Sequence, residues 1–221
     1  MSKTIVIFDL DGTLLDTLDD LSEAVNHALR LRTFPLHTRE EYMTMVGNGV
    51  RKLVTRALPA EHQDDDALVD AALADFKAYY TAHIDFHTRP YPGIPQLLCQ
   101  LHRNGVLLAV ASNKFQEGAE YLVKKYFPDI PFVAIIGNRP GFPLKPDPAI
   151  VAEILHKACV NDQSIFMIGD SPTDMKTAEN AHINAIAVSW GYRPMKGTPG
   201  LTVVDSPEQI ITHIIPPAQI N

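Results

Sequence analysis

Short runs of apolar residues alternate along the chain with stretches whose apolar residues recur at helical spacing. Unbroken apolar runs of four to six residues are typical of parallel strands that are buried on both faces. The stretch 94–101, with Ile94, Leu97, Leu98 and Leu101, is typical of an amphipathic helix. The alternation predicts a doubly wound α/β domain with a parallel sheet. The predicted strands are 5–8, 106–111, 132–136, 165–168 and 185–188.

The segment between the first two predicted strands breaks this alternation. From Leu18 to His83 the apolar residues recur only at helical spacing, although a crossover between parallel strands usually needs one helix. We interpret the segment as an inserted helical subdomain, which returns to the sheet through Pro90–Gly93. At the other end of the chain, Ile214–Pro217 cannot continue a helix, and we expect a loose terminus there.

Acidic residues follow two of the predicted strands directly. Asp9 and Asp11 follow the first strand, and Asp170 follows the fourth, with Asp174 four residues later. The carboxyl ends of parallel strands meet at one edge of a sheet, so these carboxylates are expected to lie close together. Carboxylates this close repel one another, and a divalent cation that prefers oxygen ligands, such as Mg²⁺, would compensate them.

Polar residues that suit an anion follow two further strands. Ser112 and Asn113 end the second strand and open a helix, where a hydroxyl and free amides can bind an anion. Lys145 lies in a loop between Pro143 and Pro146, and it can supply a positive charge. Taken singly, Ser112 and Asn113 are also typical helix caps, and a lysine is usually solvated. Together with the acids, they converge on one edge of the sheet.

The charge of the chain argues against several classes of partner. The 221 residues include 19 Lys and Arg and 26 Asp and Glu, giving a net charge of −7. A nucleic-acid-binding protein that relies on bulk positive charge is therefore not expected. No apolar run is long enough for a membrane span or a signal peptide, so we expect no membrane partner and a cytoplasmic location. Cys99 and Cys159 lie in apolar helical patterns and are expected to be reduced, buried thiols.

These motifs together resemble those of the haloacid dehalogenase superfamily phosphatases, and the resemblance covers nearly the whole chain. Its motifs are Asp9-Leu10-Asp11-Gly12-Thr13-Leu14, Ser112-Asn113, Lys145-Pro146, and Gly169-Asp170-Ser171 with Asp174. Within the superfamily the sequence is most similar to phosphoglycolate phosphatases. That likeness lies in Val46-Gly47-Asn48-Gly49, in Tyr79-Tyr80 with His83, and in Pro90-Tyr91-Pro92-Gly93.

The resemblance implies a Rossmann-like core with a small α-helical cap. The core would comprise residues 1–16 and 84–221, and the cap residues 17–83. Linkers near Asp16–Thr17 and His83–Arg89 would serve as hinges.

The resemblance also implies a mechanism and a site. Asp9 would be the nucleophile that forms an aspartyl-phosphate, and Asp11 would be the general acid and base. Mg²⁺ would be bound by Asp9, Asp170 and the main-chain carbonyl of Asp11, while Asp174 would orient a metal-bound water or Lys145. The phosphate-binding residues would be Thr13, Ser112, Asn113 and Lys145.

The partner implied by this site is a small-molecule phosphate ester, and the cap would select it. Gly47, Asn48 and Gly49 are interpreted either as a turn between cap helices or as a loop whose amides face the substrate. Arg139 is interpreted either as a solvated residue or as a contact to an anionic substrate. His182 stands where relatives usually carry Gly, so we expect an altered end of the helix there.

Two other functions remain open from the sequence. The same scaffold supports a phosphosugar mutase similar to β-phosphoglucomutase, which would require a bisphosphate. It also supports a non-catalytic protein that binds a phosphorylated metabolite. The sequence gives no indication of the oligomeric state.

Overall fold

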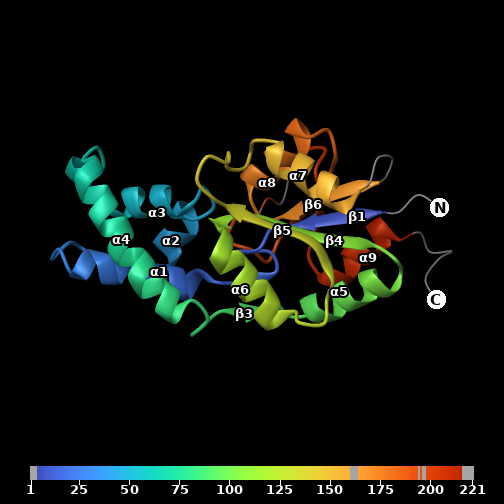
Figure 1. The fold of residues 1–221 in the computed structure, drawn as a ribbon, viewed down its shortest axis with the longest axis horizontal. Coiled ribbons are helices and arrows are strands. Elements are labelled where there is room, and N and C mark those ends of the chain that lie inside the picture. Colours follow the sequence, from blue (N-terminus) through green and yellow to red (C-terminus); the bar gives the residue numbers. More distant parts are fainter. Residues whose placement is uncertain (1–3, 160–163, 194, 196–197, 216–221) are drawn as a thin grey trace.

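A six-stranded parallel sheet forms the centre of the protein (Figure 1). The computed structural model describes residues 4–159, 164–193, 195 and 198–215. The strand order is β5-β4-β1-β6-β7-β8, and every neighbouring pair is parallel. The predicted doubly wound α/β fold is therefore confirmed. The strands are β1 (Ile5–Phe8), β4 (Leu107–Phe115), β5 (Phe132–Asn138), β6 (Ile165–Gly169), β7 (Asn184–Val188) and β8 (Thr202–Val204).

Helices cover both faces of this sheet, which explains why its strands are apolar throughout. Val6 and Phe8 of β1 pack on one face, and Ile5 and Ile7 pack on the other; all four side chains are fully buried. The first face carries α5 (Ile94–Arg103), α6 (Gln116–Tyr126) and α9 (Pro207–Ile214). The second face carries α7 (Ala149–Ala158) and α8 (Pro172–Asn180).

A group of helices inserted after β1 forms a cap beside the sheet, at the left of Figure 1. Its largest side chains in the interior are Tyr42, Phe76 and Tyr80, each fully buried. The predicted helical insert is confirmed, and no helix in the described part of the chain is long and apolar enough to cross a membrane. The cap helices are α1 (Leu18–Arg30), α2 (Arg39–Met45), α3 (Val50–Ala57) and α4 (Asp66–His83), with a short 3₁₀ turn η1 (Ala60–His62).

The two chain crossings between core and cap are joined to each other. Strand β2 (Leu15–Asp16) leaves the core, and β3 (Arg89–Pro90) returns to it; the two pair antiparallel. Asp20, in the first turn of α1, is 3% exposed and accepts hydrogen bonds from the returning chain. The donors are the amides of His87 and Thr88, both at 2.8 Å, and the Thr88 hydroxyl at 2.7 Å. The two segments predicted as hinges, near Asp16–Thr17 and His83–Arg89, are therefore bonded to each other where the chain passes between core and cap.

The ends of the chain and the cysteines differ from the sequence-based expectations. Helix α9 extends to Ile214, and both Ile214 and Ile215 are buried, so this part of the expected loose terminus packs on the core. Residues 216 and 217 lie outside the described residues. Both cysteines are free as expected, but Cys99 is only half-buried, and Cys159, at the end of α7, is exposed. His182, two residues after the end of α8, has a φ of 55°, and the amides of His182 and Ile183 bond back to the carbonyls of Glu179 and Ala178. The helix end is therefore the usual left-handed one rather than an altered one, and His182 carries the strained backbone.

Candidate active site

Three glycines allow carboxylates to pack directly against the backbone at the carboxyl edge of the sheet. Gly12 has a φ of +86°, and a Cβ there would lie 2.5 Å from Asp170 Oδ2. A Cβ on Gly169 would lie 2.3 Å from Asp174 Cγ, and one on Gly191 would lie 2.2 Å from Asp170 Cβ. Contacts this short exclude any side chain at these positions. Sequence reasoning missed Gly191, which lies in the irregular segment after β7.

The carboxylates of Asp9, Asp170 and Asp174 form a buried cluster, with one oxygen of each within 4.8 Å of the others. Burial raises the pKa of Asp9 well above its usual range, and Asp174 and Asp170 raise it further. Burial and the charge of Asp174 raise the pKa of Asp170 to about 7. Burial and mutual repulsion therefore disfavour ionisation of all three carboxylates together. The buried oxygen donors of the cluster fit a divalent cation such as Mg²⁺.

Lys145 supplies positive charge at one side of this cluster. Its ammonium nitrogen lies 2.9 Å from Asp9 Oδ1 and 2.6 Å from Asp174 Oδ1, and its side chain is 1% exposed. Burial lowers the pKa of this lysine, but the attraction of Asp174 and Asp9 outweighs burial and raises it above the usual value. Lys145 is therefore charged, and the contact is the one expected if Asp174 orients it.

Hydrogen bonds fix the orientation of Asp170 and Asp174. Asp170 accepts from the Thr13 hydroxyl at 3.2 Å and from the Tyr192 amide at 2.8 Å. Asp174 Oδ2 accepts from the amide and the hydroxyl of Ser171, at 3.1 and 2.6 Å. Because the Thr13 hydroxyl faces a carboxylate, the structure gives it the role of holding Asp170. Its phosphate-binding role stays a prediction.

The Asp11 carboxylate turns away from this cluster. Its Oδ1 accepts a hydrogen bond from the Thr17 hydroxyl at 2.8 Å and pairs with the Lys114 ammonium at 3.0 Å. Lys114 also donates to the Tyr80 hydroxyl at 2.6 Å. Lys114 was not singled out from the sequence, although a lysine directly after Ser112-Asn113 at a strand end was a usable signal. A metal contact by the main-chain carbonyl of Asp11 stays a prediction.

Asn113 joins three parts of the site through its side chain. Its Oδ1 accepts from the Lys145 amide at 2.8 Å, and its Nδ2 donates to the carbonyls of Lys145 and Gly47, both at 3.1 Å. A phosphate contact by Asn113 would therefore come from its main-chain amide. Ser112 accepts from the Lys114 amide at 3.2 Å, which leaves its own hydroxyl proton for another acceptor.

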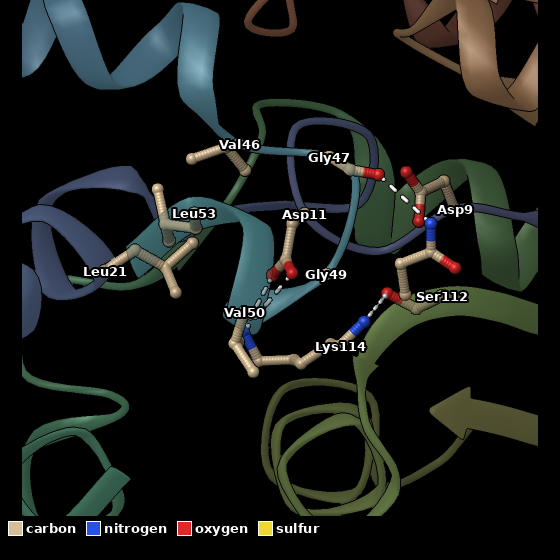
Figure 2. A pocket seen from close by; sticks show the side chains of 11 residues that line it. Asp9, Asp11, Leu21, Val46, Gly47, Gly49, Val50, Leu53, Ser112 and Lys114 are labelled. Carbon is tan, nitrogen blue, oxygen red and sulfur yellow. Dashed lines mark hydrogen bonds and ion pairs between the residues drawn. The ribbon is translucent and has the colours of Figure 1, made fainter. Parts of the chain in front are cut away.

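A pocket lies between the core edge and the cap (Figure 2). The cap side is largely apolar, while the core side carries the charged groups. Gly47 and Gly49 line the pocket and also form the turn between α2 and α3; that their amides face the substrate stays a prediction. The lining residues are Asp9, Asp11, Ser112, Asn113 and Lys114 from the core and Leu21, Val46, Gly47, Gly49, Val50 and Leu53 from the cap.

Polar contacts hold the cap loop against the core. Asn48 does not line the pocket; its Nδ2 donates to the Thr173 hydroxyl at 3.2 Å. The guanidinium of Arg193, from the segment after β7, donates to the carbonyl of Thr44 at 2.8 Å and to that of Val46. The cap loop is thus in direct contact with the core beside the pocket.

Arg139 lies outside this pocket. Its guanidinium pairs with Glu153 and lies 3.9 Å from the ring centroid of Phe142. These contacts hold it on the core surface, so the structure does not bring it to the other predicted site residues.

Comparisons with known proteins agree with this geometry. The family model for haloacid dehalogenase-like hydrolases matches residues 6–188. A phosphoglycolate phosphatase of Mesorhizobium japonicum is 35% identical over 193 residues, which cover 87% of this chain and 85% of that protein. A phosphoglycolate phosphatase of Pseudomonas putida is 34% identical over 220 residues, which cover 97% of this chain and 80% of that protein.

Solved structures show the same architecture. The crystal structure of a candidate phosphoglycolate phosphatase from Lactobacillus delbrueckii subsp. bulgaricus superposes with a TM-score of 0.87 at 33% identity. The match covers 97% of this chain and 99% of that one. The crystal structure of a predicted phosphoglycolate phosphatase from Haemophilus somnus also has a TM-score of 0.87, at 25% identity. That match covers 96% of this chain and 98% of the other.

Proposed function

The chain belongs to the haloacid dehalogenase-like hydrolases, and from this we propose that it hydrolyses 2-phosphoglycolate or a similarly small phosphate monoester through a phosphorylated Asp9. The observation that carries the proposal is the position of Asp9. Its carboxylate lines the pocket, pairs with Lys145 at 2.9 Å and belongs to the buried acidic cluster. A nucleophile, a cation and a set of metal ligands thus lie at one point.

The proposed reaction has two steps. Asp9 attacks phosphorus, and the proton on the Asp11 carboxyl passes to the leaving oxygen. Water then attacks the phosphorylated Asp9 and returns a proton to Asp11, which completes the cycle. Lys145 and the hydroxyl of Ser112 hold the oxygens of the transferred group. Asp9 and Asp170 would hold a Mg²⁺ ion, which when bound would supply positive charge to compensate the phosphoryl oxygens and the acids around them.

The lining of the pocket supports a small leaving group. The polar side chains of the lining, those of Asp9, Asp11, Ser112, Asn113 and Lys114, come from the core, whereas the cap contributes the apolar groups of Leu21, Val46, Val50 and Leu53. A sugar would place several hydroxyls against these side chains without hydrogen-bond partners, and each unpaired polar group is costly when buried. Glycolate has one carboxylate, which the amides of Gly47–Gly49 can meet. The two phosphoglycolate phosphatases identical at 34–35% support the same substrate.

A panel of phosphate esters tests this function. We expect the protein with Mg²⁺ to release phosphate from 2-phosphoglycolate faster than from glucose 6-phosphate, nucleoside monophosphates or pyrophosphate, without added bisphosphate. Phosphate release from another ester but not from 2-phosphoglycolate would overturn the proposed substrate, whereas the proposed phosphatase activity would stand. Binding of these esters without any release would support the non-catalytic alternative instead.

Mg²⁺ is expected to compete with protons for the cluster. Because the pKa of Asp170 is raised to about 7, a proton must leave before this carboxylate binds the metal. We expect the affinity for Mg²⁺ to weaken as the pH falls from about 8 to about 6, with proton release on binding. Titration calorimetry in two buffers of different ionisation enthalpy measures both. An affinity that is constant over this range, with no proton release, would contradict the assignment of Asp170 as a ligand.

A further inference from the structure

Lys114 is a buried cation that the two steps above do not use. Its ammonium nitrogen lies 3.0 Å from Asp11 Oδ1, 3.3 Å from Asp11 Oδ2 and 2.6 Å from the Tyr80 hydroxyl oxygen. The side chain is 1% exposed, and Figure 2 shows it paired with Asp11. A charged group this deeply buried is costly unless it is paired. Pairing with Asp11 offsets this cost, and it places a cation on the residue to which the proposed function assigns proton transfer.

Tyr80 brings the cap into this contact. It lies on α4 and is fully buried, with its ring stacked on Phe76 at 5.3 Å and its edge toward Phe115 at 6.1 Å. Burial raises the pKa of the Tyr80 hydroxyl well above its usual value, so it stays neutral. Tyr80 is thus a rigid, neutral acceptor for one N–H of Lys114.

The two buried lysines divide the acids of the site between them. Lys145 pairs with Asp9 and Asp174, whereas Lys114 pairs with Asp11. Besides Lys114, the hydrogen bond to the Asp11 carboxylate in the described structure comes from Thr17 at 2.8 Å. Without the positive charge of Lys114, repulsion from the neighbouring acids would change the orientation of the Asp11 carboxylate.

We propose that Lys114 and Tyr80 are positioning residues that hold the Asp11 carboxyl against the leaving oxygen, and that Tyr80 makes this placement depend on the cap. The proposal rests on the proposed function, because it assigns Asp11 the proton transfer. Lys114 keeps all of its protons in both steps. The proton still passes from Asp11 to the leaving oxygen as the P–O bond breaks, and water returns it.

The nature of the leaving group distinguishes positioning of Asp11 from a general structural role. An alkyl alkoxide needs the proton of Asp11 to leave, whereas p-nitrophenolate leaves without one. The value of kcat/KM reports the steps up to phosphoryl transfer to Asp9. For Lys114→Met we expect kcat/KM to fall about 10²-fold or more with 2-phosphoglycolate but less than about 10-fold with p-nitrophenyl phosphate, as loss of acid catalysis requires.

Tyr80→Phe tests whether the cap contributes to the placement of Asp11, because it removes the Tyr80 hydroxyl and keeps the ring. We expect a fall of about 10-fold with the alkyl ester and almost none with the aryl ester, since Lys114 keeps its charge. Tyr42→Phe is the matched control. Tyr42 is an equally buried cap tyrosine that donates to Asn26 Oδ1 at 2.8 Å, outside the pocket lining. It should leave the ratio of the two kcat/KM values unchanged.

The outcomes separate this proposal from the proposed function. If the wild-type protein hydrolyses both esters and both variants keep its ratio of kcat/KM values, or lose equally on both, only the positioning proposal is overturned. If the wild-type protein hydrolyses neither ester, the proposed function is overturned and this proposal with it. Circular dichroism checks folding, and if Lys114→Met does not fold, Tyr80→Phe against Tyr42→Phe decides.

Discussion

Asp9→Asn is expected to abolish phosphate release while leaving the fold intact. The variant keeps the shape of the side chain but has no carboxylate to attack phosphorus. Removing a nucleophile leaves only binding and electrostatic effects, so we expect turnover to fall by at least about 10⁴-fold. The measurement is phosphate release in the presence of Mg²⁺, with substrate well above KM. Turnover close to that of the wild-type protein would exclude Asp9 as the nucleophile.

The stability of this variant provides an independent check. Burial and the neighbouring Asp174 and Asp170 disfavour the ionised form of Asp9 in the metal-free protein, as its raised pKa shows. A neutral amide at this position removes that repulsion, so the thermal midpoint without metal should stay the same or rise. Asp129→Asn, at an exposed loop position, is the control and should retain full turnover. A large drop in the midpoint of Asp9→Asn would mean that the loss of turnover reports unfolding.

Lys145→Met is expected to have the second-largest effect, on both activity and stability. The variant leaves Asp9 and Asp174 without their shared cation, and breaking a buried ion pair costs about 3–5 kcal/mol. Under the proposed function it also removes a donor to the transferred phosphoryl group, and we expect kcat to fall about 10²–10³-fold. Phosphate release and chemical denaturation measure the two effects. Lys157→Met on α7, whose partner is Glu153 and whose side chain is half exposed, is the matched control.

The loss of stability in Lys145→Met should depend on pH in a defined direction. Lys145 lowers the pKa of Asp9, so its removal raises that pKa further above the usual value. The folded variant then binds more protons than the unfolded chain between the usual and the raised pKa, and its stability falls as pH rises through this window. Acidification should restore part of the lost stability. A loss that is the same at every pH would show that packing, not charge, is responsible.

The sequence predicted the main elements of the core because their patterns are local. Each predicted strand lies within or close to an observed one. Asp9, Asp170 and Asp174 meet as expected, whereas the Asp11 carboxylate, expected beside them, turns away to Lys114. The short strands β2, β3 and β8 were missed, since two or three residues carry no recognisable period. The C-terminal helix α9 was missed because Pro216 and Pro217 favoured a loose end, although Ile210, Ile211 and Ile214 pack on the core.

The candidate site was predictable where chemistry follows a strand end, and less so where two distant segments meet. Asp9, Asp170, Asp174 and Lys145 were found from their positions alone. The pairing of Lys114 with Asp11 and Tyr80 was not predicted, because it joins the core to a cap helix. The side chain of Asn113 ties the Lys145 loop to Gly47, which was not predicted, and the phosphate-binding role of Asn113 stays a prediction. Such contacts depend on tertiary packing, which one sequence does not specify.

The pairing of β2 with β3, which joins the two chain crossings, makes the cap a module that can be exchanged as a unit. Because Leu15 lies opposite Pro90 and Asp16 opposite Arg89, the chain leaves and re-enters the core at the same place. The order and direction of the sheet strands therefore do not depend on how many residues the cap contains. The entropic cost of closing a longer insertion grows only slowly with its length. The cap helices can thus change without re-routing the strands that place Asp9 and Asp170. Under the proposed function, selectivity and chemistry therefore lie on separable parts of one chain.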